Sequence, residues 1–147
     1  MFDSSIDAAA LAVDETAAVR AVIDRAHLAW RRGDGRSYAA CFTAETCDTT
    51  YFGLCRDGRA ANADLHGALF QFAAKGVAVD AEIEAIEWLC ADAALVRTAS
   101  HGAAPGYQTY LLVKRDDAWR IRSFQHTPVN PLAAWAVRTV RRGRLST

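Results

Sequence analysis

The stretch that decides the fold is residues 77–127, VAVDAEIEAIEWLCADAALVRTASHGAAPGYQTYLLVKRDDAWRIRSFQHT. Four runs within it alternate apolar and polar residues, the pattern of half-buried β-strands. Turn signals separate the runs at 91–92, 104–106 and 116–117. The alternation changes phase between Ala85 and Ile86, which predicts a bulge or sharp bend in the first run. We therefore expect a four-stranded antiparallel meander.

Helical spacing precedes this meander. In residues 14–33 the apolar side chains recur at intervals of three and four, with Asp14 suited to cap the helix and Gly33 to end it. Asp34 is suited to cap a second, short helix. Residues 47–52 alternate as a strand, and the pattern leaves open which of its two faces points inward.

Helical spacing returns at residues 59–76 and again at 132–142. Helices grouped ahead of a meander predict an α+β fold, with the helices packed on one face of a strongly bent, mostly antiparallel sheet. Such a cone has an open end that suits a small molecule. We expect a flexible segment at 1–13, the domain at 14–130, and a basic helix and tail at 131–147.

Composition fits a single globular domain. The chain has 147 residues, 52% hydrophobic and 23% charged. No apolar run approaches the roughly 20 residues of a membrane span. The first basic residue is Arg20, so we expect no leader, a cytoplasmic location and no membrane partner. The four cysteines are then expected as reduced thiols.

Charge is balanced overall but uneven along the chain. Residues 118–147 contain six arginines and no acid. We favour a solvated terminal helix here, with an acidic carrier protein as the alternative partner. A nucleic-acid binder would spread its basic residues over the whole domain, so no nucleic acid is expected.

Several short motifs along residues 14–130 resemble the NTF2-like superfamily, and within it the SgcJ/EcaC (DUF4440, SnoaL-like) group. The matching residues are Ala29-Trp30, Gly33-Asp34, Tyr38, Phe42-Thr43, Gly58-Arg59-Ala60-Ala61, His66, Leu69-Phe70, Asp92, Ala94-Leu95-Val96, Gln108-Thr109, Trp119-Arg120, Phe124-Gln125 and Thr127. The resemblance implies the NTF2-like cone, a small-molecule ligand, a homodimer through the sheet and no cofactor.

Two familiar mechanisms of this superfamily lack their key residue here. Counted from Phe42, the general-base aspartate of ketosteroid isomerases falls near Thr50, which has no useful basicity. SnoaL-type cyclases use an acid on a late strand, and residues 119–127 contain none. The fold alone supplies no reaction.

The candidate catalytic residues are His66, Gln125 and Tyr51. His66 shares a helix face with apolar residues, and its imidazole transfers protons near neutral pH. Gln125 has the strand parity of Trp119, so its amide is expected to face inward and orient a substrate. Tyr51 offers a phenol to a ligand oxygen. Each of the three also fits an ordinary packing role.

The candidate substrate-binding residues are Tyr38, His27, Trp30, Phe70 and Asp48. Asp48 becomes the carboxylate of the pocket, and a possible base, if its face of the strand points inward. The histidines are too scattered to suggest a metal site.

We therefore expect a small-molecule enzyme without cofactor, in bacterial natural-product biosynthesis of the polyketide type. A cyclase, isomerase, dehydratase or hydrolase fits, acting on a hydrophobic ligand. The alternative is a non-catalytic accessory or carrier protein of such a pathway.

Overall fold

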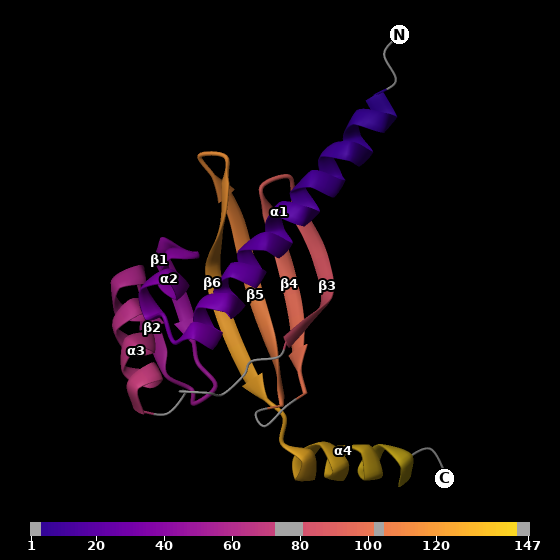
Figure 1. The fold of residues 1–147 in the computed structure, drawn as a ribbon. Coiled ribbons are helices and arrows are strands. Elements are labelled where there is room, and N and C mark those ends of the chain that lie inside the picture. The colour runs from indigo at the N-terminus through magenta and orange to yellow at the C-terminus, as the bar shows by residue number, and fades with distance from the viewer. Residues whose placement is uncertain (1–3, 73–80, 102–104, 144–147) are drawn as a thin grey trace.

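The computed structural model describes residues 4–72, 81–101 and 105–143 (Figure 1). Its elements are α1 Ser4–Arg32, α2 Gly35–Ala40, β1 Phe42–Thr49, β2 Cys55–Asp57, α3 Arg59–Phe72, β3 Ala81–Cys90, β4 Ala93–Ser100, β5 Gly106–Arg115, β6 Ala118–Pro128 and α4 Pro131–Gly143. The strands form one six-stranded sheet in the order β2-β1-β6-β5-β4-β3. The α+β architecture predicted from the sequence is confirmed.

The sheet is mixed because β1 runs parallel to β6, whereas its other neighbouring strands pair antiparallel. α1 crosses one face of the sheet, and α2 and α3 stand together beside β1 and β2 (Figure 1). The core lies between α1 and that face. Its centre includes Val19, Ile23, Leu112 and Ile121, all of which are fully buried.

Local signals explain the element boundaries. Gly33 has a φ of 66°, the left-handed conformation that glycine adopts freely, and it ends α1 as expected. Asp34 caps α2, since its carboxylate accepts hydrogen bonds from the backbone and hydroxyl of Ser37. The expected irregularity of β3 is confirmed by a register shift between Ile83 and Ala85.

The structure differs from the sequence predictions in the starts of two elements and in one strand that was not predicted. α1 begins at Ser4 rather than at Asp14, because the alanine-rich residues 8–13 continue the helix. β1 starts at Phe42 and so includes residues ahead of the alternating run. β2 was missed because a three-residue, fully exposed edge strand has no readable alternation. The predicted helix end at Gly76 and the turn at 104 lie outside the described residues.

The terminal helix extends from the end of β6 away from the rest of the chain (Figure 1). Leu132, Trp135 and Val137 of α4 are mostly exposed. No helix in the described part of the chain is both long and apolar enough to cross a membrane.

Candidate functional site

Two rows of side chains cross the inner face of the sheet, toward the helices. Cross-strand partners share a face, so the first row runs from Asp48 through Phe124 and Tyr110 to Val96. All four of these residues are buried. The second row lies two residues further along the strands, about 7 Å away.

Asp48 is the carboxylate of the first row. Its side chain is 0% exposed, so the strand face left open by the sequence is now decided. The carboxylate accepts hydrogen bonds from the Thr46 hydroxyl at 3.0 Å and from the Asn62 side-chain amide. Burial raises the pKa of Asp48 to about 6, against the opposing effect of the Thr46 hydrogen bond. Asp48 is therefore a base whose strength suits neutral pH.

His66 lies one helical turn after Asn62 on α3 and is also buried. Its Nδ1 is 2.9 Å from the Asn62 carbonyl oxygen. A carbonyl only accepts, so Nδ1 carries the hydrogen and Nε2 carries the lone pair. Burial lowers the pKa of His66, which keeps the ring neutral at pH 7.

An aromatic cluster surrounds His66. The Tyr38 ring lies 4.3 Å from the imidazole, and Trp30 and Phe70 pack around it with ring centroids 5.6 and 6.0 Å away. Burial is the main cause that raises the pKa of Tyr38, and the nearby Tyr110 and Asp48 add to it. Tyr38 therefore stays protonated as a hydrogen-bond donor. These four sequence candidates are brought together.

A directed hydrogen-bond chain spans α1, β4 and β5. Tyr110 and Thr98 both donate to Gln108 Oε1, at 3.1 and 2.6 Å. His27 Nε2 lies 3.2 Å from the Tyr110 oxygen, and it donates because the Tyr110 hydrogen is already directed to Gln108. Burial lowers the pKa of His27 and raises that of Tyr110, so both remain neutral.

The second row consists of His126, Gln108 and Thr98. The expected inward direction of Gln125 is wrong, since this side chain is exposed and its neighbours Phe124 and His126 face inward. The cause is a bulge. Leu112 pairs with Ile121 but Leu111 pairs with Ser123, and the extra residue reverses the parity of everything after it.

Tyr51 follows β1 and is half-buried, with its ring 4.9 Å from that of His126. It therefore stands near the second row. Four residues of the inner face were not predicted as site residues, namely His126, Gln108, Tyr110 and Asn62. Asn62 lies one turn before His66, a spacing that places both on one helix face. No sequence signal marked the bulge that turns His126 inward.

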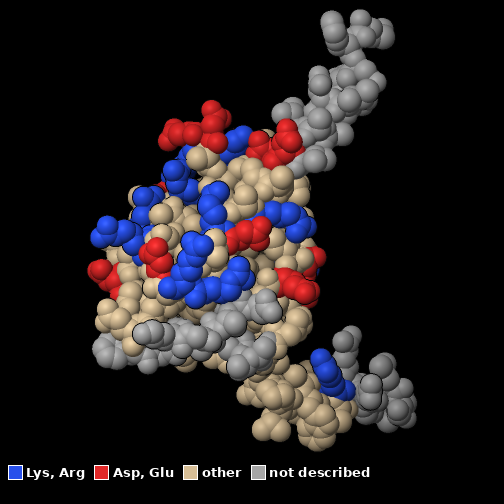
Figure 2. Space-filling view, viewed as in Figure 1, with Lys and Arg blue, Asp and Glu red and all other residues tan. Residues whose placement is uncertain are grey.

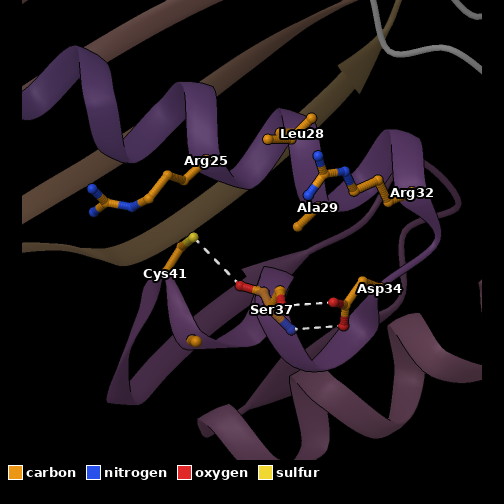
Figure 3. Close-up of a pocket in the computed structure, with 8 residues that line it drawn as sticks. Arg25, Leu28, Ala29, Arg32, Asp34, Ser37 and Cys41 are labelled. Carbon is orange, nitrogen blue, oxygen red and sulfur yellow. Dashed lines mark hydrogen bonds between the residues drawn. The ribbon is translucent and has the colours of Figure 1, made fainter.

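A hollow lies between α1 and α2 (Figure 3). It has a volume of about 290 Å³, and Arg25, Arg32, Asp34, Ser37 and Cys41 are among its lining residues. Figure 2 shows basic side chains gathered on this side of the molecule, with acidic ones between them. Asp34 and Ser37 are joined in the α2 cap, and the Cys41 thiol donates to the Ser37 carbonyl oxygen at 3.5 Å. The residues that line this hollow therefore do not include the buried Asp48 and His66 of the inner face.

Within the described ranges, no three or more His, Cys, Asp or Glu side chains are grouped to hold a metal ion. The inner face instead combines one buried carboxylate, neutral imidazoles, phenols and amides. Groups of these kinds are chemically able to move protons and to bind neutral oxygens.

The curved sheet with its helices on one face defines the NTF2-like cone fold. Solved structures share it. A ketosteroid isomerase-like protein from Erwinia carotovora atroseptica is 20% identical, with a TM-score of 0.68 over 78% of this chain and 96% of that one. A scytalone dehydratase-like protein from Novosphingobium aromaticivorans is 13% identical, with a TM-score of 0.69 over 83% and 89%.

An NTF2-like protein of unknown function from Shewanella oneidensis is 21% identical, with a TM-score of 0.61 over 76% of this chain and 98% of that one. The sequence matches no family model and no curated protein. At these identities the likeness shows the fold alone, so the reaction has to be argued from the site.

Proposed function

We propose that this protein binds a neutral carbonyl compound inside the cone and catalyses proton transfer at the adjacent carbon. Isomerases and dehydratases share this first step. The observation that carries the proposal is the fully buried Asp48 with a pKa of about 6. A general base works best when its pKa lies near the operating pH.

In the proposed step, the Asp48 carboxylate takes a proton from the carbon beside the carbonyl. The C–H electron pair forms the new carbon–carbon double bond, and the carbonyl π pair moves onto oxygen as an enolate. The protonated phenol of Tyr38 is the donor placed to stabilise that oxygen. His66 Nε2 is the second proton acceptor, in keeping with the proton-transfer role expected from the sequence.

The surroundings favour a neutral substrate. Among the described residues, the buried polar side chains include no Lys or Arg, so an anionic group would enter without a counter-ion. Trp30, Phe42, Phe70 and Phe124 provide apolar ring surface beside the polar groups. An aromatic or alicyclic ketone matches this combination.

The test is hydrogen–deuterium exchange at the α-carbons of 4-phenylbutan-2-one in D2O, followed by proton NMR. We expect exchange well above the buffer rate, and a loss of about 100-fold or more in Asp48→Asn. Asp64→Asn is the matched control, because Asp64 is an exposed carboxylate on α3. Exchange at the buffer rate, or equal exchange in Asp48→Asn, contradicts the proposal.

One observation favours the non-catalytic alternative. Both Asp48 oxygens already accept hydrogen bonds, from Thr46 and Asn62, as in a structural network that only shapes a binding site. A carrier protein would bind the ketone in calorimetry without accelerating exchange, and Asp48→Asn would show no fall in exchange rate.

The finer resemblance to the SgcJ/EcaC (DUF4440, SnoaL-like) group supports a role in polyketide-type biosynthesis as part of this proposal. We also propose a homodimer through the outer face of the sheet. Leu95, Leu111 and Val113 lie on that face, opposite the helices in Figure 1. Sedimentation measurements would return a dimer, and Leu111→Glu would convert it to a monomer.

A further inference from the structure

His126 occupies a position that neither packing nor the proton-transfer step explains. It lies on the inner face directly opposite Gln108, in the row next to that of Asp48. Its Nε2 is buried and has no hydrogen-bond partner among the described protein atoms. Buried polar atoms are paired in the great majority of cases, so an unpaired one marks a specific role.

Among the described residues, no neighbour of the ring is hydrogen-bonded to Nε2. Tyr51 and Phe124 meet the imidazole edge to face, at centroid distances of 4.9 and 6.3 Å. The cross-strand Gln108 Oε1 already accepts hydrogens from Thr98 and Tyr110. The ring is therefore held by aromatic contacts, while its buried Nε2 has no hydrogen-bond partner among the described residues.

Gly106 provides the space for this nitrogen. A Cβ built on Gly106 would lie 2.6 Å from His126 Nε2, closer than any real contact of that kind. Every other residue at position 106 would therefore push the ring aside. The imidazole stands directly over this glycine.

We infer that His126 binds a second oxygen of the substrate, at the end remote from the carbon that Asp48 deprotonates. Burial lowers the pKa of His126, so the ring is neutral and pairs with a hydroxyl rather than an anion. The two rows lie about 7 Å apart, so the carbonyl and the hydroxyl of the substrate are separated by a comparable distance. A neutral ketone with a ring between its carbonyl and its hydroxyl has this separation. The carbonyl end of this assignment rests on the proposed function.

The test compares two ketones that differ by one hydroxyl, 4-phenylbutan-2-one and 4-(4-hydroxyphenyl)butan-2-one. We expect the protein to bind the hydroxylated ketone about tenfold more tightly in calorimetry. His126→Phe keeps the ring contacts and should abolish this preference.

Two further variants separate ligand binding from packing. His126→Gln should restore much of the preference, since its amide reaches the place of Nε2, whereas the shorter His126→Asn should not. Thr109→Ala is the matched control, because Thr109 lies next to Gln108 on β5 but on the other face. Circular dichroism confirms that each variant is folded.

The outcomes distinguish the two proposals. A hydroxyl preference that is lost in His126→Phe supports this inference even if neither ketone exchanges deuterium, in which case only the proton-transfer proposal fails. Equal affinity of the protein for the two ketones overturns the inference. So does a preference that survives in His126→Phe, and so does failure to bind either ketone.

Discussion

At the scale of single residues, Asp48 is the proposed base because its negative charge is costly where it lies. Its side chain is buried, and that burial makes it a stronger base than an exposed aspartate. Burial thus strengthens the base but destabilises the folded protein, and catalytic groups commonly show this conflict between activity and stability. Two predictions follow from the same raised pKa.

The first concerns the pH dependence of the proposed reaction. The exchange rate of 4-phenylbutan-2-one should rise about tenfold per pH unit below pH 6 and level off above it, since only the carboxylate accepts a proton. NMR rates between pH 4.5 and 8.5 give the profile. A rate that is constant across this range would mean that another group is the base.

The second concerns stability. The folded pKa of Asp48 lies above its ordinary value of 3.8, so the folded state holds the proton more tightly and loses stability as the pH rises through about 6. Asp48→Asn removes this cost. Urea unfolding should show the variant more stable by about 1–3 kcal/mol at pH 8 and nearly equal to the parent protein at pH 3. A less stable variant at pH 8 would contradict the burial argument.

At the scale of elements, the sequence predicted the types of the main helices and strands because their periodicities are long and regular. The helical spacing put His66 on the apolar side of its helix for the same reason, and His66 is buried. The sequence prediction failed at Gln125, because one inserted residue in β6 reverses the parity and leaves no mark in composition. Pairing between strands, which a single sequence does not show, decides such positions.

The contact between α2 and α3 depends on one glycine. A Cβ on Gly35 would lie 2.8 Å from the backbone nitrogen of Gly67, whereas a Cβ on Gly67 would meet nothing within 4 Å. Gly35→Ala should therefore destabilise the protein by about 1–3 kcal/mol. Gly67→Ala, in the interior of α3, should stabilise it by about 0.5–1 kcal/mol. Thermal unfolding followed by circular dichroism measures both, and effects of equal sign would rule out the close approach.

The projecting helix α4 is expected to be dispensable for folding. It stands apart from the sheet in Figure 1 and exposes Leu132, Trp135 and Val137. A chain ending at Asn130 should melt within about 2 °C of the full-length protein and keep its ketone exchange. Calorimetry and NMR test the two expectations, and a large fall in Tm would show that α4 packs on the domain.

At the scale of the whole molecule, the buried histidines set the response to acid. Burial lowers the pKa of His27, His66 and His126, so the unfolded chain binds more protons than the folded one below about pH 6.5. Stability should therefore fall as the pH drops from 7 to 5, with Asp48 opposing the fall below pH 6. The urea midpoint measured across this range tests the sign, and a constant or rising midpoint contradicts it.

The parallel pairing of β1 with β6 has a consequence for the order of folding. β1 is made early and β6 is the final strand, yet the two are neighbours in the sheet. A chain growing from its N-terminus completes the helical half long before Asp48 gains the neighbour that encloses it. Pairing between segments so distant in sequence is slow to form. The burial that raises the pKa of Asp48 is therefore completed last. A half-synthesised chain would therefore carry an ordinary aspartate where the finished protein carries its candidate catalyst.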